Sequence, residues 1–276
     1  MKMLNIDENK CKKDGICVAV CPGKFIQLKD GDGFPEMVPG GDEFCLICGH
    51  CLSVCPNDAL RHELIPIEDC PPIQKDLLIN EQQAVQFIRS RRSIRVFKDK
   101  PVETEKIQRL IEIARYAPSG TNTQLVEWVV FNDKKKINNL GGLVAEWIRD
   151  VVENRPESAP YPVERLRLFL ATWDSGTDSI LRNAPALVIA IAPQETGNGI
   201  VDPTIALSYL ELVAPVFGLG TCWAGLLRRG MLNSSSIREV IGISDRYPHY
   251  YPMMVGYPKF KYYRVPERKT PKITWK

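Results

Sequence analysis

The spacing of the cysteines constrains this chain more than any other feature, because eight of its nine cysteines lie within the first seventy residues. Four of them form the run Cys45–Pro56, which has the spacing C-x2-C-x2-C-x3-C-P. The N-terminus lacks an apolar stretch of signal-peptide length, so we expect a cytoplasmic protein whose thiols stay reduced. Cysteines in that compartment indicate metal binding rather than disulfides. A zinc site would use cysteine pairs separated by a long loop, which this run does not have.

The run resembles the cluster-binding loop of bacterial two-cluster ferredoxins. The upstream segment Cys11–Pro22 is a variant copy of it, in which three cysteines match and Asp14 stands where the second cysteine should be. The resemblance implies a crossed arrangement of ligands for two 4Fe-4S clusters. One cluster would be held by Cys45, Cys48, Cys51 and Cys21, and the other by Cys11, Cys17 and Cys55, with Asp14 as candidate fourth ligand.

The aspartate leaves the type of the first cluster open. The alternatives are a 4Fe-4S cluster with Asp14 or solvent as a ligand, a three-iron cluster, or a labile site, and Asp14-Gly15 also reads as an ordinary turn. His50 lies within the second loop and is expected to bind solvent or a hydrogen-bond partner rather than iron. Cys70 matches neither copy and is expected to be a linker cysteine.

The composition of the chain and the prolines that follow residue 65 predict two domains. Residues 1–65 form the ferredoxin-type domain, residues 66–78 a proline-containing, extended linker, and residues 79–276 a larger body. The segment Gly23–Phe44, rich in Gly, Asp and Pro, predicts a hairpin with loops.

The body mixes helices and strands without a regular repeat. No G-x-G-x-x-G sequence follows a strand, so a Rossmann nicotinamide site is not indicated. The aromatic residues Trp147 and Trp173 lie in a stretch, 143–182, that matches no motif, and they are expected in the core. The predicted helices cover 81–90 (with Asn80 as N-cap), 105–116, 203–217 and 235–241, and the predicted strands cover 126–132, 186–192 and 253–257.

Three segments of the body resemble the FMN-dependent nitroreductase family, namely Arg91–Phe97, Ala117–Gln124 and Gly218–Trp223. Their order and spacing also fit, so the resemblance covers about residues 81–268. It implies an α+β sandwich that binds FMN and forms a homodimer with the flavin at the subunit interface. One departure is that Leu125-Val126 follows the loop where many members have Pro-Trp.

The resemblance also assigns residues to the flavin. Arginines offer a planar fork of donors that suits the dianionic FMN phosphate. We therefore expect the phosphate on the side chains or backbone of Arg91, Arg92, Ser93, Arg95 and Arg268. We expect the rest of the flavin on Pro118, Ser119, Asn122, Gly220 and Thr221. No catalytic side chain is assigned, because flavin chemistry requires an oriented acceptor rather than a triad.

These features predict a reductase that passes electrons from a protein donor, such as reduced ferredoxin, through the clusters to FMN. From FMN they would go to a nitroaromatic, a quinone or an activated alkene. The alternatives are an electron-relay protein that serves another protein and, among enzymes, flavin or cofactor remodelling. The net charge of +3 suggests neither nucleic-acid nor membrane binding. The stretch Pro203–Phe217 is apolar nearly all round, which calls for burial on all sides and is consistent with a homodimer.

Overall fold

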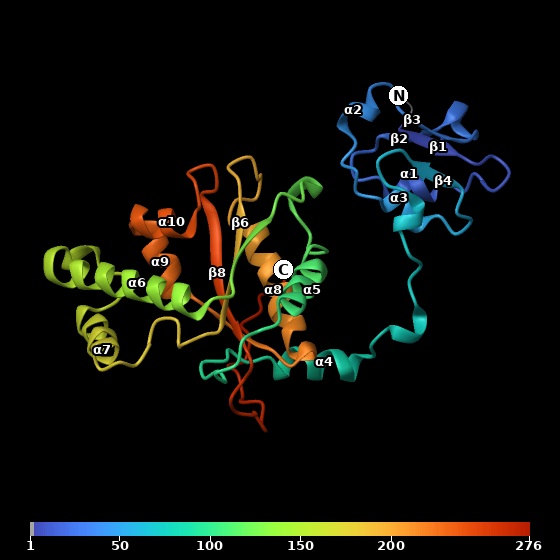
Figure 1. The fold of residues 1–276 in the computed structure, drawn as a ribbon. Coiled ribbons are helices and arrows are strands. Elements are labelled where there is room, and N and C mark those ends of the chain that lie inside the picture. The colour runs from blue at the N-terminus through green and yellow to red at the C-terminus, as the bar shows by residue number, and fades with distance from the viewer. Residues whose placement is uncertain (1–2) are drawn as a thin grey trace. The chain divides into compact units, whose positions relative to one another are not determined.

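A computed structural model describes residues 3–276 and shows two compact units (Figure 1). The first unit, called the head, reaches to Leu78 and includes Thr121–Thr123; the second, called the body, comprises Ile79–Gly120 and Gln124–Lys276. Within residues 3–276, no helix has the length and apolar character needed to cross a membrane.

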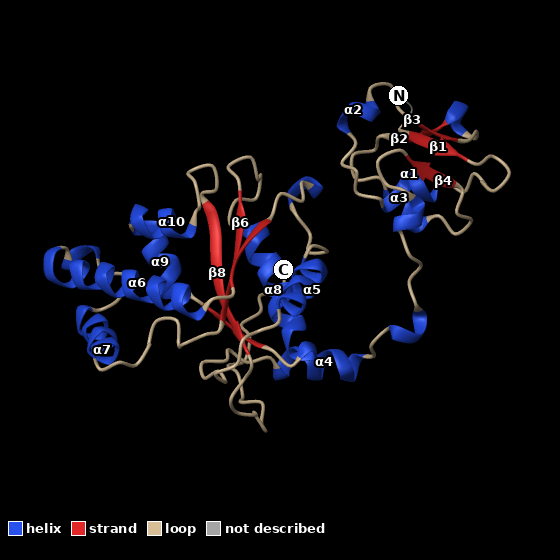
Figure 2. Ribbon diagram, in the orientation of Figure 1, coloured by secondary structure: helices blue, strands red, loops and turns tan. Residues whose placement is uncertain are grey.

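The head consists of two short antiparallel strand pairs with three short helices (Figure 2). Strand β1 pairs with β4, and β2 pairs with β3, which confirms the hairpin predicted between residues 23 and 44. The elements are β1 Leu4–Ile6, α1 Ile16–Val20, β2 Ile26–Leu28, η1 Lys29–Gly31, β3 Pro35–Met37, α2 Gly41–Phe44, α3 His50–Val54 and β4 Leu60–His62.

The segment after β4 is exposed but not uniformly extended. It contains two single 3-10 turns, η2 Ile67–Asp69 and η3 Lys75–Leu77. The extended connector predicted from its prolines is therefore wrong in detail, because local i to i+3 hydrogen bonds form on either side of Pro71 and Pro72.

The body is built on a four-stranded antiparallel sheet in the order β5-β6-β8-β7 (Figure 2). Its strands are β5 Glu127–Phe131, β6 Ala186–Ala192, β7 Gly220–Trp223 and β8 His249–Gly256. The helices are α4 Glu81–Ser90, α5 Thr104–Ala114, α6 Lys134–Asn154, α7 Val163–Asp174, α8 Val201–Val213, α9 Gly225–Asn233 and α10 Ser235–Ile241, with 3-10 turns η5 Pro156–Ser158 and η6 Ala214–Phe217. The 3-10 turn η4 Gly120–Asn122 begins in the body, and its last two residues belong to the segment Thr121–Thr123 of the first unit.

Strand β6 is buried along its whole length because helices cover both faces of the sheet. Leu187, Ile189 and Ile191 pack in a core with α6, α7, α9 and α10. Alternate residues such as Val188 and Ala190 pack in a second core with α5 and α8. This confirms the strand predicted over residues 186–192, and the period of two explains how its side chains pack in both cores.

Other predictions from the sequence hold at the level of single residues. Asn80 caps α4 through a capping box with Gln83, each side chain hydrogen-bonding the other residue's backbone N–H at 2.9 Å. Trp147 is 7% exposed in the core, and Trp173 packs against the same cluster. These aromatic side chains are core residues, as expected.

Helix α8 ends earlier than the helix predicted over residues 203–217. Its last α-helical residue is Val213, and the 3-10 turn η6 follows, because Pro215 has no N–H to donate to an α-helical hydrogen bond. Gly218 then ends the helical segment at φ 72°, in the left-handed conformation. In the single chain Val216 is 71% exposed and Tyr209 40% exposed, so the burial on all sides that we expect in a homodimer stays a prediction.

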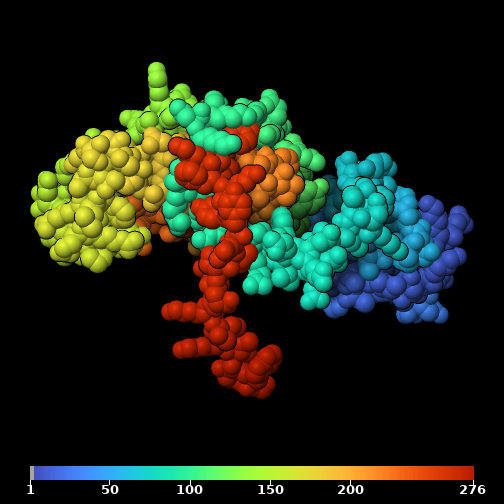
Figure 3. All heavy atoms as spheres, turned by 90° about the horizontal axis from the view of Figure 1, so that it is seen from below, coloured from blue at the N-terminus to red at the C-terminus, as the bar shows by residue number. Residues whose placement is uncertain are grey.

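Beyond β8 the chain leaves the sheet as a tail. Every residue from Lys259 onward is exposed, and no helix or strand forms there. Lys259–Tyr262 line a cavity with Arg91 and Arg92, and Figure 3 shows the end of the tail, in red, extending away from the body.

Candidate functional site

The two cysteine segments of the head have the same backbone conformation at two pairs of matching positions. Gly15 precedes α1 at φ 69°, and Gly49 precedes α3 at φ 70°, both in the left-handed region that favours glycine. Lys13 and Ile47, two residues before each glycine, also have positive φ, at 56° and 50°. The repeat inferred from the sequence is therefore a repeat of structure, and Asp14 occupies the place that Cys48 has in the second copy.

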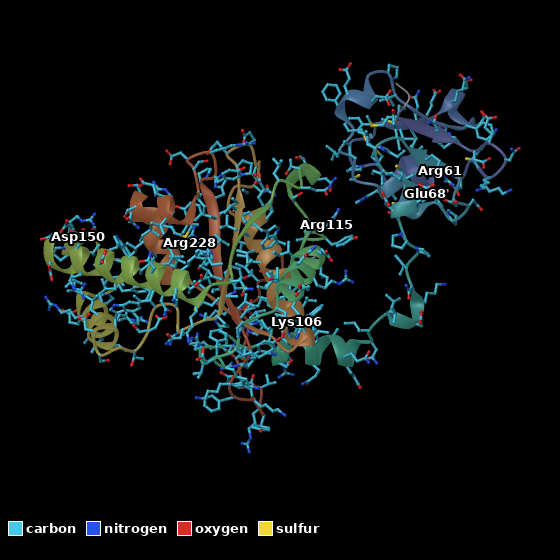
Figure 4. All side chains as sticks on the ribbon, viewed as in Figure 1. Arg61, Glu68, Lys106, Arg115, Asp150 and Arg228 are labelled. Carbon is cyan, nitrogen blue, oxygen red and sulfur yellow. The ribbon has the colours of Figure 1, made fainter. Side chains whose placement is uncertain are left out.

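Four cysteines predicted to share a cluster lie around one cavity. Cys21 comes from the first copy, and Cys45, Cys48 and Cys51 come from the second. Leu4, Phe25, Ile26 and Met37 are among the apolar residues that complete its lining. The structure thus brings together the four cysteines of one predicted ligand group, and Figure 4 shows sulfur atoms gathered in the head.

The chemistry of this donor set fits a cationic metal cluster. Burial, with smaller contributions from neighbouring Cys45 and Cys48, raises the pKa of Cys51 to about 11. Iron would bind these sulfurs as thiolates, so metal must take the place of their protons. In residues 3–276 no three His, Cys, Asp or Glu side chains converge as they would around a single ion. Thiolates on a cubane bind separate irons and need not converge on one point.

The second predicted ligand group is Cys11, Cys17 and Cys55, with Asp14 as its candidate fourth member. Burial raises the pKa of Cys17, and the charges of Cys11 and Asp14 add smaller contributions in the same direction. Asp14 is exposed, and its Oδ1 accepts a hydrogen bond from the Ile16 N–H at 3.2 Å. The aspartate therefore forms the turn that precedes α1 at the position of the missing cysteine.

Backbone and side-chain donors reach several of these sulfurs. The Phe25 N–H donates to Cys21 Sγ at 3.3 Å, and the Ala59 N–H donates to Cys55 Sγ at 3.4 Å. The imidazole of His62 lies with Nε2 3.6 Å from Cys45 Sγ. Sequence reasoning missed His62, although the repeat shows it: seven residues after Cys21 stands Leu28, and seven after Cys55 stands His62.

Of the two other residues singled out in the head, His50 lines the cysteine cavity and Cys70 lies in the predicted linker. His50 is exposed, and its Nδ1 is 3.4 Å from the Cys48 carbonyl oxygen, which suits the expected hydrogen-bonding role. Cys70 is exposed, and its thiol lies 3.5 Å from the Pro66 carbonyl oxygen.

In the body, the segment after α4 runs along β7. The Ile94 N–H donates to the Thr221 carbonyl at 2.8 Å, and Ser93 forms a parallel bridge with Thr221. A Cβ on Gly220 would lie 2.3 Å from Ile94 Cγ1, so glycine is needed there for this close approach. Two predicted flavin segments, residues 91–95 and 220–221, are thereby brought together.

These segments line a cavity of about 480 Å³ whose wall carries several cationic side chains. Arg91, Arg92, Gly220 and Thr221 belong to its wall. Lys98, Lys259 and Lys261 add further positive charge, and Glu211 is the acidic side chain in the lining. Sequence reasoning did not identify these lysines, which are separated along the chain. Such a wall suits an anionic group.

Arg91 is held in place by a buried carboxylate. Its guanidinium donates to Glu211 Oε1 at 3.0 Å, and the Trp223 Nε1–H donates to Oε2 at 2.9 Å. Glu211 is 7% exposed, whereas the Arg91 side chain is 27% exposed. A guanidinium has five N–H donors, so Arg91 retains donors for a ligand.

The other cationic candidates lie nearby. Arg268 and Lys269 share a cavity of about 580 Å³ with Arg91 and Arg92. Arg95 lies within electrostatic range of Cys222, where burial raises the thiol pKa and the charge of Arg95 opposes that effect.

The loop with the remaining candidates lines a different cavity, of about 200 Å³. Pro118 and Ser119 belong to it, and so does Arg115, which Figure 4 labels. The Gly120 N–H donates to both carboxylate oxygens of buried Asp202 at 3.2 Å. Asn122 ends η4 with φ 58°, in the left-handed region. A single chain therefore places Pro118 and Ser119 around one cavity and Arg91 and Gly220 around another.

Comparison with known proteins divides the chain into an N-terminal part and a larger second part, as the fold does. Residues 88–257 match the Nitroreductase family, and residues 3–56 match the 4Fe-4S dicluster domain. A protein of Archaeoglobus fulgidus with the provisional name NADH dehydrogenase/NAD(P)H nitroreductase is 23% identical over 197 residues, which are 69% of this chain and 95% of that protein. The polyferredoxin protein MvhB of Methanothermus fervidus is 41% identical over 69 residues, which are 24% of this chain and 15% of that protein.

The fold has relatives among solved structures. A nitroreductase with bound FMN from Bacteroides fragilis superimposes with a TM-score of 0.57 at 20% identity, covering 71% of this chain and 98% of that one. At this identity the likeness concerns the fold, and it confirms the predicted α+β architecture of the body.

Proposed function

Since the chain belongs to the nitroreductase family and has a 4Fe-4S dicluster domain in front of the family's fold, we propose that it passes electrons from the head's clusters to FMN. The proposed donor is a protein such as reduced ferredoxin, and the proposed acceptor is a small electrophile of the nitroaromatic, quinone or activated-alkene class. The observation that supports this most is the cationic cavity of Arg91, Arg92, Gly220 and Thr221 in a chain whose head also gathers four cysteines around one cavity.

We assign the FMN phosphate to Arg91, Arg92, Ser93, Arg95 and Arg268. Charge-assisted hydrogen bonds from guanidinium groups orient a phosphate and offset its charge. Lys259 and Lys261, which line the same cavity as Arg91, add positive charge there. Bound FMN would supply the exchange between single electrons and hydride.

We assign the rest of the flavin to Gly220 and Thr221 and to the loop of Pro118, Ser119 and Asn122. In one chain, Pro118 and Ser119 line a cavity other than that of Arg91 and Gly220. A homodimer resolves this separation if the loop of one subunit completes the site of the other. Exposed apolar side chains support an interface, among them Val85 and Ile88 on α4 and Val216 on η6, at 44%, 59% and 71% exposure.

A homodimer predicts that the molecular mass in solution is twice that of the chain. Sedimentation at micromolar concentration would measure it. Because the flavin site would then depend on both subunits, dilution below the dimer dissociation constant should release FMN. A monomer that keeps its FMN would contradict the shared site.

The electron path is tested by anaerobic turnover of the full chain with three donors: reduced ferredoxin, NADH and NADPH. Acceptors from the three chemical classes are each offered. We expect ferredoxin-driven turnover to be lost in Cys48→Ser, since Cys48 lines the cysteine cavity, and kept in the control Cys70→Ser, whose thiol is exposed in the linker.

Several outcomes would contradict the proposal. Full ferredoxin-driven turnover in Cys48→Ser would show that this cluster is not the electron entry point. Electrons that reach FMN but no small acceptor, while a second protein becomes reduced, would favour a relay. Metal analysis that finds zinc and no acid-labile sulfide would end the iron–sulfur assignment.

A further inference from the structure

Besides Asp14, the two copies in the head differ at the end of the strand that follows each cysteine segment. β2 follows Cys21 as β4 follows Cys55, and the two strands end at Leu28 and His62 respectively. Leu28 lies against the first loop, with its Cδ1 3.9 Å from the place that a Cβ on Gly15 would take. By its position in the repeat, the first copy therefore has a leucine where the second has a histidine.

His62 is a buried polar side chain with two defined contacts. It is 6% exposed and lines the same cavity as Cys21, Cys45, Cys48 and Cys51. Its Nδ1 accepts a hydrogen bond from the Leu64 N–H at 3.1 Å. A ring nitrogen that accepts carries no hydrogen, so the neutral ring has its hydrogen on Nε2. That hydrogen faces Cys45 Sγ, 3.6 Å from Nε2.

We propose that His62 is a positioning residue for electron transfer, whose Nε2–H donates to Cys45 Sγ and raises the reduction potential of the cluster that Cys45 holds. The proposal rests on the iron–sulfur part of the proposed function. Adding an electron makes a cluster and its thiolates more negative, and an N–H donor at a sulfur stabilises the reduced form. The fold gives no such side chain to the first copy, where Leu28 stands, so the two clusters receive different tuning.

The test is an anaerobic redox titration of the full chain, followed by electron paramagnetic resonance of the reduced clusters. His62→Leu gives the second copy the residue of the first, His62→Gln keeps an N–H donor, and His50→Leu is the matched control. His50 is exposed and lies beside a carbonyl oxygen rather than a sulfur. We expect one midpoint potential to become more negative in His62→Leu, to return toward the wild-type value in His62→Gln, and to stay unchanged in His50→Leu.

Unchanged potentials in His62→Leu would overturn the proposal, as would an equal shift in His50→Leu, which would indicate solvent access rather than a hydrogen bond. Iron and sulfide are counted in every protein. If wild type lacks them, the iron–sulfur assignment fails instead. If only His62→Leu loses them, pulsed resonance on protein labelled with 15N-histidine decides. A histidine nitrogen coupling that is present in wild type and His50→Leu but absent in His62→Gln supports the bond, and no coupling in wild type refutes it.

Discussion

Replacing Arg91 should destabilise the body as well as weaken FMN binding, because Arg91 neutralises a buried carboxylate. In Arg91→Ala, Glu211 keeps only the Trp223 N–H as its hydrogen-bond partner among the contacts described above. Removing one partner of a buried ion pair costs about 3–5 kcal/mol. The Arg91 side chain is 27% exposed, so we expect the lower end of that range. A loss of about 3 kcal/mol lowers the melting temperature of a domain this size by roughly 6–12 °C.

A double-mutant cycle separates the two roles of Arg91. Glu211→Gln removes the buried charge while leaving Arg91 free to bind phosphate. The double variant Arg91→Ala, Glu211→Gln should regain much of the stability lost in Arg91→Ala, since no uncompensated charge remains. It should still bind FMN about ten- to a hundredfold more weakly, because a charge-assisted contact worth about 1.5–3 kcal/mol is gone.

The assay is thermal unfolding of the four proteins with their FMN removed, followed by flavin titration of each. Removing FMN first keeps its binding energy out of the melting temperature. The reasoning is refuted if Arg91→Ala melts at the wild-type temperature, or if the double variant is as unstable as Arg91→Ala. Full FMN affinity in the double variant would remove Arg91 from the phosphate site while leaving its structural role intact.

Three further predictions concern single positions. Asp14→Cys should give the first copy a full set of cysteines and a more oxygen-tolerant 4Fe-4S cluster; an unchanged resonance signal and unchanged stability in air would place Asp14 away from the iron. Gly220→Ala should lower the melting temperature of the flavin-free protein, because its Cβ would meet Ile94 Cγ1 at 2.3 Å; an unchanged value would show that the backbone adapts freely. The pKa of Glu103 is lowered to about 2, mainly because the Tyr257 hydroxyl donates a hydrogen bond to its carboxylate. This carboxylate therefore stabilises the body above about pH 4.5 and loses that effect as the pH falls to about 2. Glu103→Gln should flatten stability across that window in acid titrations followed by circular dichroism, and an identical profile would contradict the assignment.

Local features explain why much of the fold followed from the sequence. The cysteine spacings place ligands on short loops whose glycines, Gly15 and Gly49, take the left-handed conformation in both copies. Asn80 and Gln83 lie three residues apart, so the capping box at the start of α4 is visible in the sequence. Residues 186–192 predicted a strand, and the structure buries it on both faces because both its alternate sets of residues are apolar.

Contacts between distant segments were decided only by the tertiary structure. Glu211 is 120 residues from Arg91, and neither residue type indicates the other as its partner. The tautomer of His62 and its approach to Cys45 depend on the Leu64 N–H and on the pairing of β4 with β1. Residue types and spacings thus determined which groups can bind iron and phosphate, because those follow from local chemistry. The fold alone determined which of them are buried, which are already paired and which share a cavity, because these properties arise when segments far apart in the sequence meet.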